Sequence, residues 1–295
     1  MSQLSVIRDR IKTISNLNKV TRAMEMVTRT RIRRVRQNSL NARNYQELYA
    51  GVFTAAARRE LECPAEKAQK NTPLKYYLAF FAHKGFCGGY NDKLLTSLRA
   101  ALRADQDQPR LYLLGRQQAK WRQVLKQDFQ HIEAAEKTYQ AETADLLTEL
   151  QARILTDGET EVFFVYNQLV SVLEQKPLVQ KIYPLALPPA VHPAEILLEP
   201  EYALLYPDLL RGYLAACLER VYWEATAGEY YARLLSMKNA NDNAELILTR
   251  LNLEYNKTRQ TRITQELSEV ISTFDILKVL EAKKTREGVL YGGRQ

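Results

Sequence analysis

The feature that most constrains this chain is the segment of residues 208–284, which contains no proline. These 77 residues contain only two glycines, Gly212 and Gly228. An unbroken α-helix of that size would be roughly 115 Å long, at about 1.5 Å per residue, several times the diameter of an ordinary domain. Such a helix cannot be buried in one compact core, so we expect it to lie against another helix or a partner protein.

Apolar residues in the distal part of this stretch recur at alternating steps of four and three: Ile263, Leu267, Val270, Phe274 and Leu277. This spacing predicts a coiled-coil seam, the row of side chains that faces a partner helix. The same row continues toward the N-terminus with mixed apolar and polar residues: Leu246, Thr249, Leu253, Asn256 and Gln260. A dry seam between two helices would not use these residues. We therefore expect the middle of the row to face something besides the partner helix.

A second helical pattern opens the chain, with apolar residues at steps of three or four: Leu4, Ile7, Ile11, Ile14, Leu17, Val20, Met24 and Val27. No glycine occurs before Gly51 and no proline before Pro64, which predicts one helix of about fifty residues. Two long helices with the same spacing favour an antiparallel pair. The alternative is two separate surface helices, but neither could bury its length on a middle domain of about 130 residues.

Between the helices the pattern changes to short apolar strands that alternate with helices. The strands are expected at 75–82, 110–114, 161–166 and 179–183, and the helices at 91–102, 117–127 and 138–155. Such alternation predicts an α/β domain with a largely parallel sheet near residues 74–190. The expected segments are an N-terminal helix 1–60, a central domain 74–195, a C-terminal helix 205–284 and a tail 285–295.

Positive charge is concentrated at the start of the chain. The net charge is +8, and residues 1–59 hold 13 Lys and Arg against 3 acids. Five arginines lie between residues 29 and 36. They suit either an arm that binds nucleic acid or a shaft surrounded by acidic protein surfaces. Their spacing spreads them around a helix, so charge alone leaves both interpretations open.

Residues typical of targeting or catalysis are scarce. The start MSQLSVIRDR lacks the apolar stretch of a signal peptide, and three distant cysteines favour reduced thiols. Gly85, Gly88 and Gly89 do not form the GxGxxG pattern, which makes a phosphate site at this turn a weak alternative. His83, His131 and His192 do not lie at metal-ligand spacing. The sequence therefore predicts no catalytic residue, no metal and no cofactor.

Four segments decide between these interpretations. Residues 7–27, the turn 85–91 (GFCGGYN), and the segments 237–243 (MKNANDN) and 255–269 resemble the gamma subunit of F-type ATP synthases. The resemblance covers residues 1 to about 272, with the motifs in the family's order. It implies an antiparallel coiled coil of the two terminal helices plus a Rossmann-like α/β central domain. It also implies a rotor that couples ion flow through a membrane c-ring to ATP synthesis or hydrolysis elsewhere.

The resemblance further implies partners and contact residues. The partners would be the alpha and beta subunits, the epsilon subunit and the c-ring, with one copy of this chain per complex and no nucleic acid. The chain would be non-catalytic and peripheral to the membrane, on the cytoplasmic face of the bacterial inner membrane. The residues implied in subunit contacts are Met24, Arg233, Arg259, Gln260, Thr264, Glu266 and Glu269.

The chain also departs from the family pattern. The usual chain of the family stops near Ser272, so the role of the extension that follows is not implied by the match. We expect Phe274 and Leu277 to lie in or just above an apolar sleeve formed by the partner ring. The dense arginine run suggests partner surfaces more acidic than usual, whose binding would weaken with salt.

Overall fold

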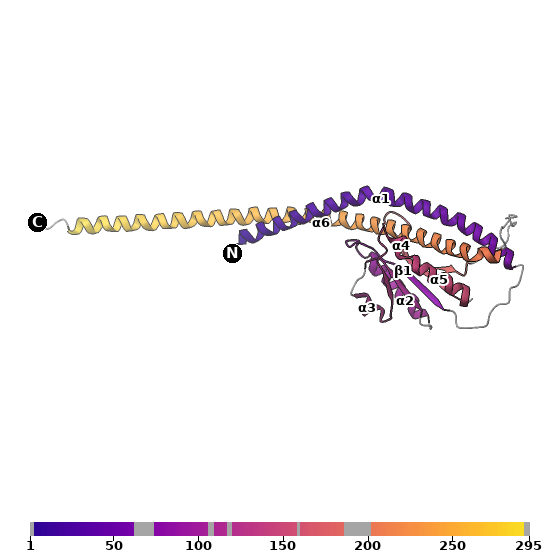
Figure 1. Ribbon diagram of the computed structural model, residues 1–295. Helices are drawn as coiled ribbons and strands as arrows, with labels where there is room; N and C mark the ends of the chain where they lie inside the picture. Colours follow the sequence, from indigo (N-terminus) through magenta and orange to yellow (C-terminus); the bar gives the residue numbers. More distant parts are fainter. Residues whose placement is uncertain are drawn as a thin grey trace. The chain divides into compact units, whose positions relative to one another are not determined.

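The computed structural model describes residues 3–61, 74–105, 109–116, 120–157, 160–185 and 202–291. Two long helices, α1 (Gln3–Leu61) and α6 (Tyr202–Tyr291), enclose the elements of an α/β domain in the sequence (Figure 1). These elements are β1 (Lys75–Phe80), α2 (Tyr90–Ala104), β2 (Arg110–Leu114), α3 (Lys120–Leu125), β3 (Gln130–Ile132), α4 (Tyr139–Glu142), α5 (Ala144–Asp157), β4 (Glu161–Leu169) and β5 (Gln175–Tyr183). The chain forms two compact units, residues 1–23 with 238–295 and residues 24–237.

The sheet of the second unit has the strand order β3-β2-β1-β4-β5. The pairs β1–β2, β1–β4 and β2–β3 are parallel, and β4–β5 is antiparallel. The prediction of a largely parallel sheet is confirmed. The sequence pattern missed β3, which has only three residues, and shortened β5, whose first half includes Pro177 and is largely exposed.

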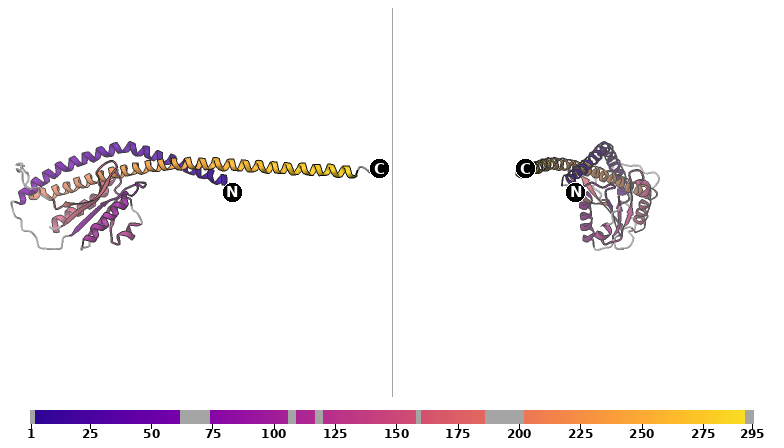
Figure 2. Two further views of the ribbon diagram at one scale, coloured as in Figure 1. Left: turned by 180° about the vertical axis from the view of Figure 1, so that it is seen from behind. Right: turned by 90° about the vertical axis from the view of Figure 1, so that its left-hand side faces the viewer.

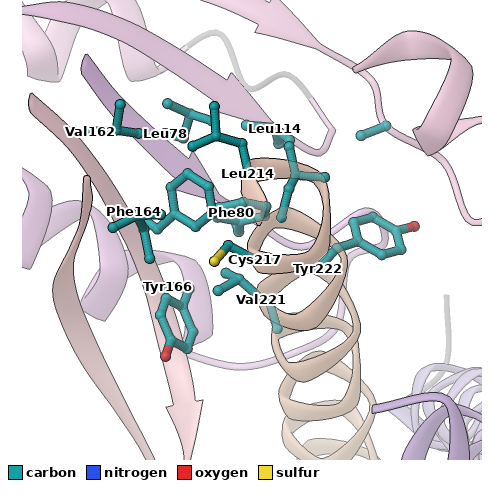
Figure 3. Packing of buried hydrophobic residues seen from close by; sticks show 14 of the residues in the cluster. Leu78, Phe80, Leu114, Val162, Phe164, Tyr166, Leu214, Cys217, Val221 and Tyr222 are labelled. Carbon is teal, nitrogen blue, oxygen red and sulfur yellow. The ribbon is translucent and has the colours of Figure 1, made fainter. Parts of the chain in front are cut away.

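Helices cover both faces of this sheet (Figure 2). Side chains alternate along β1, so that Tyr76, Leu78 and Phe80 join one core and Tyr77 and Ala79 the other. The first core also contains α5 and α6, and the second contains α2 and α3. Figure 3 shows α6 laid on the first face, with side chains of the helix pointing at those of β1 and β4.

Helix α1 packs along α6 within the second unit. Phe53 of α1 stacks on Tyr213 of α6 with ring centroids 4.8 Å apart. A methyl group on Gly212 would lie 1.9 Å from the Tyr49 hydroxyl, so glycine allows the close approach of the two helices. Nearer the start of α1, Arg31 pairs with Tyr230, which raises the pKa of Arg31. Residue numbers rise in α1 as they fall in α6, so the pair is antiparallel.

The first unit contains the rest of this helix pair. Arg8 donates a hydrogen bond of 2.9 Å to the Tyr255 hydroxyl, and Arg22 forms an ion pair with Glu245. Thr21 donates a hydrogen bond to Asn241, which is buried. These contacts again run antiparallel. No described helix is long and apolar enough to cross a membrane.

The predicted seam of α6 is wrong in the first unit. The buried and half-buried residues that face α1 there are Asn241, Ala244, Leu248, Leu251, Tyr255 and Thr258. They repeat at steps of three and four on a different side of the helix from the predicted row. Leu246 and Leu253 of the predicted row are exposed, and so are all its members from Ile263 to Leu277. The physical reason is length: α1 begins at Gln3, close to Tyr255, and leaves no part of itself for the distal row (Figure 1).

The expected apolar stripe of α1 is also partly wrong. Ile7, Ile11 and Ile14 are at least half-buried, whereas Leu17, Val20 and Val27 are exposed. The buried positions of this part of the helix are Asn18 and Thr28, with Thr21 half-buried. The buried positions of α1 thus follow a seven-residue repeat that includes polar residues. Apolar residues that do not fall on this repeat are exposed.

We predict that Asn18→Leu stabilises the helix pair. Asn18 is 8% exposed, and its Oδ1 atom has no hydrogen-bond partner among the described residues. Leucine removes this buried polar atom and adds apolar area, for a gain of about 1 kcal/mol. Hydrogen exchange of the amides in residues 10–20 should slow several-fold. Asn16→Leu, at an exposed position two residues away, should have no such effect, and equal slowing in both variants would contradict the prediction.

Candidate functional site

An exposed row of side chains runs along α6 in the first unit. Its members are Leu246, Thr249, Leu253, Asn256, Gln260, Ile263, Leu267, Val270, Phe274 and Leu277, and we call it the free face of α6. The apolar members are between 48% and 67% exposed. Within the described residues, no other element covers this face. An exposed row with this many large apolar residues is typical of a surface that binds a partner protein.

Five predicted contact residues lie along this part of α6, four of them on or beside the free face. Gln260 belongs to it, and Arg259 lies four residues before Ile263, on the same side of the helix. Thr264 lies three residues before Leu267, and Glu266 four before Val270. Glu269 lies one turn after Glu266, outside the free face. All five are exposed, so their side chains are accessible to a partner.

One of the five takes part in a surface ion pair. Arg262 Nε donates to Glu266 Oε1 at 2.8 Å, and both side chains are more than half exposed. Exposed pairs of this kind contribute at most about 1 kcal/mol. Glu266 can therefore exchange Arg262 for a partner's cation at little cost.

Met24 lies on α1 in the second unit and is half-buried. Met26 and Val27 beside it are exposed. Met24 is therefore only partly accessible and lies next to exposed apolar side chains.

Arg233 differs from the other six predicted contact residues because its side chain is buried. Its guanidinium pairs with Glu229 one turn earlier, and both side chains are 4% exposed. Arg233 also donates to the backbone oxygens of Lys84 and Gly85, each at 3.1 Å. Its described contacts are thus with α6 itself and with the turn that follows β1.

That turn has an unusual backbone. Phe86 has φ of +64° and Gly88 has φ of +58°. Positive φ is costly for a bulky residue and persists only where neighbouring groups impose it. Phe86 is nevertheless 66% exposed, so its own packing does not supply that support. The two hydrogen bonds from Arg233 hold the backbone immediately before it.

The arginine run lies along α1 in the second unit. Arg29 pairs with Glu25 at 2.6 Å, and Arg33, Arg34 and Arg36 follow it along the helix. The charge is thus spread along the helix, as the sequence indicates.

The described residues contain no group of three His, Cys, Asp or Glu side chains that could hold a metal ion. Cys87 and Cys217 are free and buried, while Cys63 and His192 lie outside the described residues. Burial raises the pKa of Cys87 and raises that of Cys217 to about 11. Both thiols are therefore protonated near neutral pH and are poor nucleophiles.

We predict that His83 makes the stability of the domain depend on pH. Burial lowers its pKa below the ordinary value of about 6.5, although Glu229, Glu142 and Glu133 oppose this and Arg233 reinforces it. Below pH 6.5 the unfolded chain binds a proton that the folded chain resists, so the free energy of unfolding should fall as the pH falls. Denaturant unfolding between pH 7 and 5 measures this slope. His83→Gln should reduce it, and an unchanged slope would contradict the prediction.

The sequence analysis missed Glu229. The signal available was its position four residues before Arg233 on a predicted helix, a spacing that allows an ion pair. Many pairs on long helices have that spacing, and nothing in the pattern indicated that this one would be buried.

Known proteins with similar sequences are ATP synthase gamma chains. The sequence pattern that describes the ATP synthase family matches residues 3–277. The ATP synthase gamma chain of Polynucleobacter asymbioticus is 30% identical over 296 residues, which cover 92% of this chain and 98% of the relative. That of Synechococcus sp. (strain JA-3-3Ab) is 29% identical, with 94% and 100% covered.

Solved structures share the fold. The rotor of the Euglena gracilis mitochondrial ATP synthase superposes with a TM-score of 0.58 at 16% identity, covering 88% of this chain and 98% of the other. The central stalk and c-ring of the Tetrahymena thermophila enzyme gives a TM-score of 0.54 at 17% identity, with 75% and 99% covered. The paired long helices with an α/β domain are thus a known architecture.

Proposed function

We propose, since this chain belongs to the gamma-chain family of ATP synthases, that its paired helices form the shaft of a rotary machine. As the central-stalk subunit it couples ion flow through the c-ring to ATP synthesis or hydrolysis at the alpha and beta subunits. The observation that carries this conclusion is the family match over residues 3–277. It also favours the shaft interpretation of the arginine run over a nucleic-acid arm.

The partners of the shaft follow from the same assignment. The alpha and beta subunits surround the helices, and the epsilon subunit and the c-ring bind the α/β domain and the helices beside it. One copy of the chain would serve each complex, because a single shaft must be asymmetric to place three catalytic sites in different states. The similar solved structures are described as a rotor and as a central stalk with c-ring.

The free face of α6 is the surface we assign to the surrounding ring. It combines exposed apolar residues with Arg259, Gln260, Thr264 and Glu266, and Glu269 is exposed on the same stretch of α6. Polar contacts at exposed positions are individually weak, so three equivalent partners can exchange them in turn. This supports the proposal that these five side chains touch the ring as the shaft turns.

Met24 and Arg233 have different parts in this proposal. Met24, half-buried on α1, would contact the ring near its catalytic interface. Arg233 is buried, so we propose that it affects those contacts through the turn whose backbone it holds.

We also propose that the chain has no active site of its own, and that ATP is turned over on its partners. Its place would be the cytoplasmic face of the bacterial inner membrane, as a peripheral subunit. The bacterial source of the 30% identical relative supports this location.

Reconstitution tests the proposed function. The purified chain alone should not hydrolyse ATP, whereas adding it to alpha and beta subunits should give a complex with one copy and rapid hydrolysis. The double variant Arg259→Ala/Gln260→Ala should lower the hydrolysis rate roughly tenfold, the effect of losing about 1.4 kcal/mol of contact. Gln265→Ala, exposed on the opposite side of α6, is the control. ATP hydrolysis by the chain alone, or equal rates in the two variants, would overturn the proposal.

A further inference from the structure

The crevice at the carboxyl ends of β1 and β4 is the place where this architecture usually binds a ligand. In the strand order β3-β2-β1-β4-β5, the chain adds β2 and β3 on one side of β1 and then β4 and β5 on the other side, so the order of connection reverses between β1 and β4. In open α/β sheets, ligands bind outside the carboxyl ends of the strands at this reversal. The backbone amides of the loop after the first strand commonly bind the anionic part of the ligand.

In this chain a side chain of α6 occupies that position. The backbone amide of His83 donates to Glu229 Oε2 at 2.9 Å, and the amide of Lys84 donates to Glu229 Oε1 at 3.2 Å. The Glu229 side chain is 4% exposed. The loop after β1 therefore binds a carboxylate, as it would bind a phosphate or carboxylate of a ligand, but the carboxylate comes from the chain itself.

Arg233 completes the set of interactions. It pairs with Glu229 and donates to the backbone oxygens of Lys84 and Gly85. A buried ion pair is stable only when further hydrogen bonds satisfy both partners. Here the loop supplies amide donors to Glu229 and carbonyl acceptors to Arg233, so both charges are satisfied.

The rest of the crevice is closely filled. The cavity that remains beside Glu229 is about 10 Å³, which is room for one water molecule at most. The Tyr90 hydroxyl donates to the backbone oxygen of Ala225 on α6 at 2.8 Å, and Asn167 at the end of β4 donates to the backbone oxygen of Tyr90 at 3.0 Å. The cavity beside Glu229 is therefore far too small for a nucleotide.

We propose that Glu229 is an internal ligand: it occupies the anion position of the α/β domain and, with Arg233, fastens that domain to α6. The mechanical consequence rests on the proposed function. A rotor must carry its α/β domain and its long helix as one body. A joint made by a buried charge pair and four backbone groups fixes their orientation, because hydrogen bonds are directional whereas the hydrophobic effect is not. The weak phosphate site considered for the Gly85 turn is thus occupied from within.

Removal of the carboxylate tests the proposal on the purified full-length chain. Glu229→Ala leaves two amides and the Arg233 guanidinium facing a hole that acetate fits. The equilibrium constant for unfolding should rise roughly 100-fold or more, because one partner of a buried pair is lost. Acetate at saturating concentration should then raise the melting temperature by roughly 3–6 °C, compared with chloride at equal ionic strength.

The matched control is Glu219→Ala on the same helix. Among the described residues, Glu219 accepts a hydrogen bond only from the Tyr139 hydroxyl, at 3.1 Å, so its removal should create no anion site. Acetate should not stabilise this variant or the wild-type chain. Equal stabilisation of all three proteins, or none in Glu229→Ala, would overturn the proposal.

A second variant covers the case in which Glu229→Ala does not fold. Glu229→Gln keeps the shape of the side chain but not its charge, so the amides of His83 and Lys84 should exchange hydrogen at least roughly tenfold faster than in wild type, the effect of losing about 1.4 kcal/mol from charge-assisted hydrogen bonds. Unchanged exchange would overturn the proposal, and so would displacement of Glu229 by ATP or inorganic phosphate in the wild-type chain. These measurements need no partner subunit, so a failure of the proposed rotor function would leave them unaffected.

Discussion

Gly115→Ala is expected to destabilise the α/β domain by about 3–5 kcal/mol, a large part of the stability of a domain this size. Gly115 has φ of +119°, and a methyl group there would lie 2.3 Å from the backbone oxygen of Phe81. That oxygen cannot retreat easily, since the amide of Phe81 donates to Leu114 at 2.7 Å and the amide of Gly115 to Ile132 at 3.0 Å. Backbone strain of about 1–3 kcal/mol adds to a steric clash of similar size.

Denaturant unfolding followed by tryptophan fluorescence measures this loss, because Trp121 is buried against Phe81 in the same part of the domain. Gly89→Ala is the control. Gly89 has φ of −82°, and nothing lies within 4 Å of a methyl group there, so the change should stay within about 0.5 kcal/mol. Similar stabilities of the two variants would show that the close contact at Gly115 does not exist in the folded chain.

The second large effect is expected at the distal end of the free face, in the assembled complex. Deleting the residues after Ile271 should leave the folding of the second unit unchanged, because residues 261–278 are exposed and contribute no core. Assembly and torque should suffer, since Phe274 and Leu277 are 58% and 54% exposed and available to an apolar sleeve. Burial of such a side chain contributes roughly 1.5–3 kcal/mol, so each loss should weaken binding about tenfold or more.

A finer comparison separates the free face from helix length. Phe274→Gln with Leu277→Gln should reproduce most of the deletion's loss of ATP-driven rotation. Ile276→Gln should not, although Ile276 is 60% exposed, because it lies off the free face. If the deletion left assembly and torque untouched, Phe274 and Leu277 would have no bearing role.

Much of the fold could be predicted from local pattern. The absence of proline over residues 208–284 and of glycine before Gly51 indicated two long helices, and α6 and α1 are those helices. One proline, Pro207, lies inside α6 five residues after Tyr202, where it removes one hydrogen bond near the start of the helix. Strands β1, β2 and β4 follow the apolar runs of the sequence closely. The helix expected over 138–155 is instead divided at Thr143 into α4 and α5.

The positions of the candidate contact residues along α6 were also readable in advance. The spacing in the sequence places Gln260 on one helical face with the apolar residues of the row. The role of that face did not follow. The row from Leu246 to Leu277 has the better apolar repeat, yet it stays free, while α1 lies against Asn241, Ala244 and Tyr255.

The sequence by itself determined the lengths and types of the elements, because helix and strand periods and breaking residues act locally along the chain. The domain boundaries expected near residues 60, 74, 195 and 205 are still predictions. Only the tertiary structure decided which row of α6 meets α1, and that Glu229 and Arg233 are buried at the end of β1. Those outcomes depend on groups more than a hundred residues apart in the sequence, and a periodic pattern shows which residues share a face but not what will cover it.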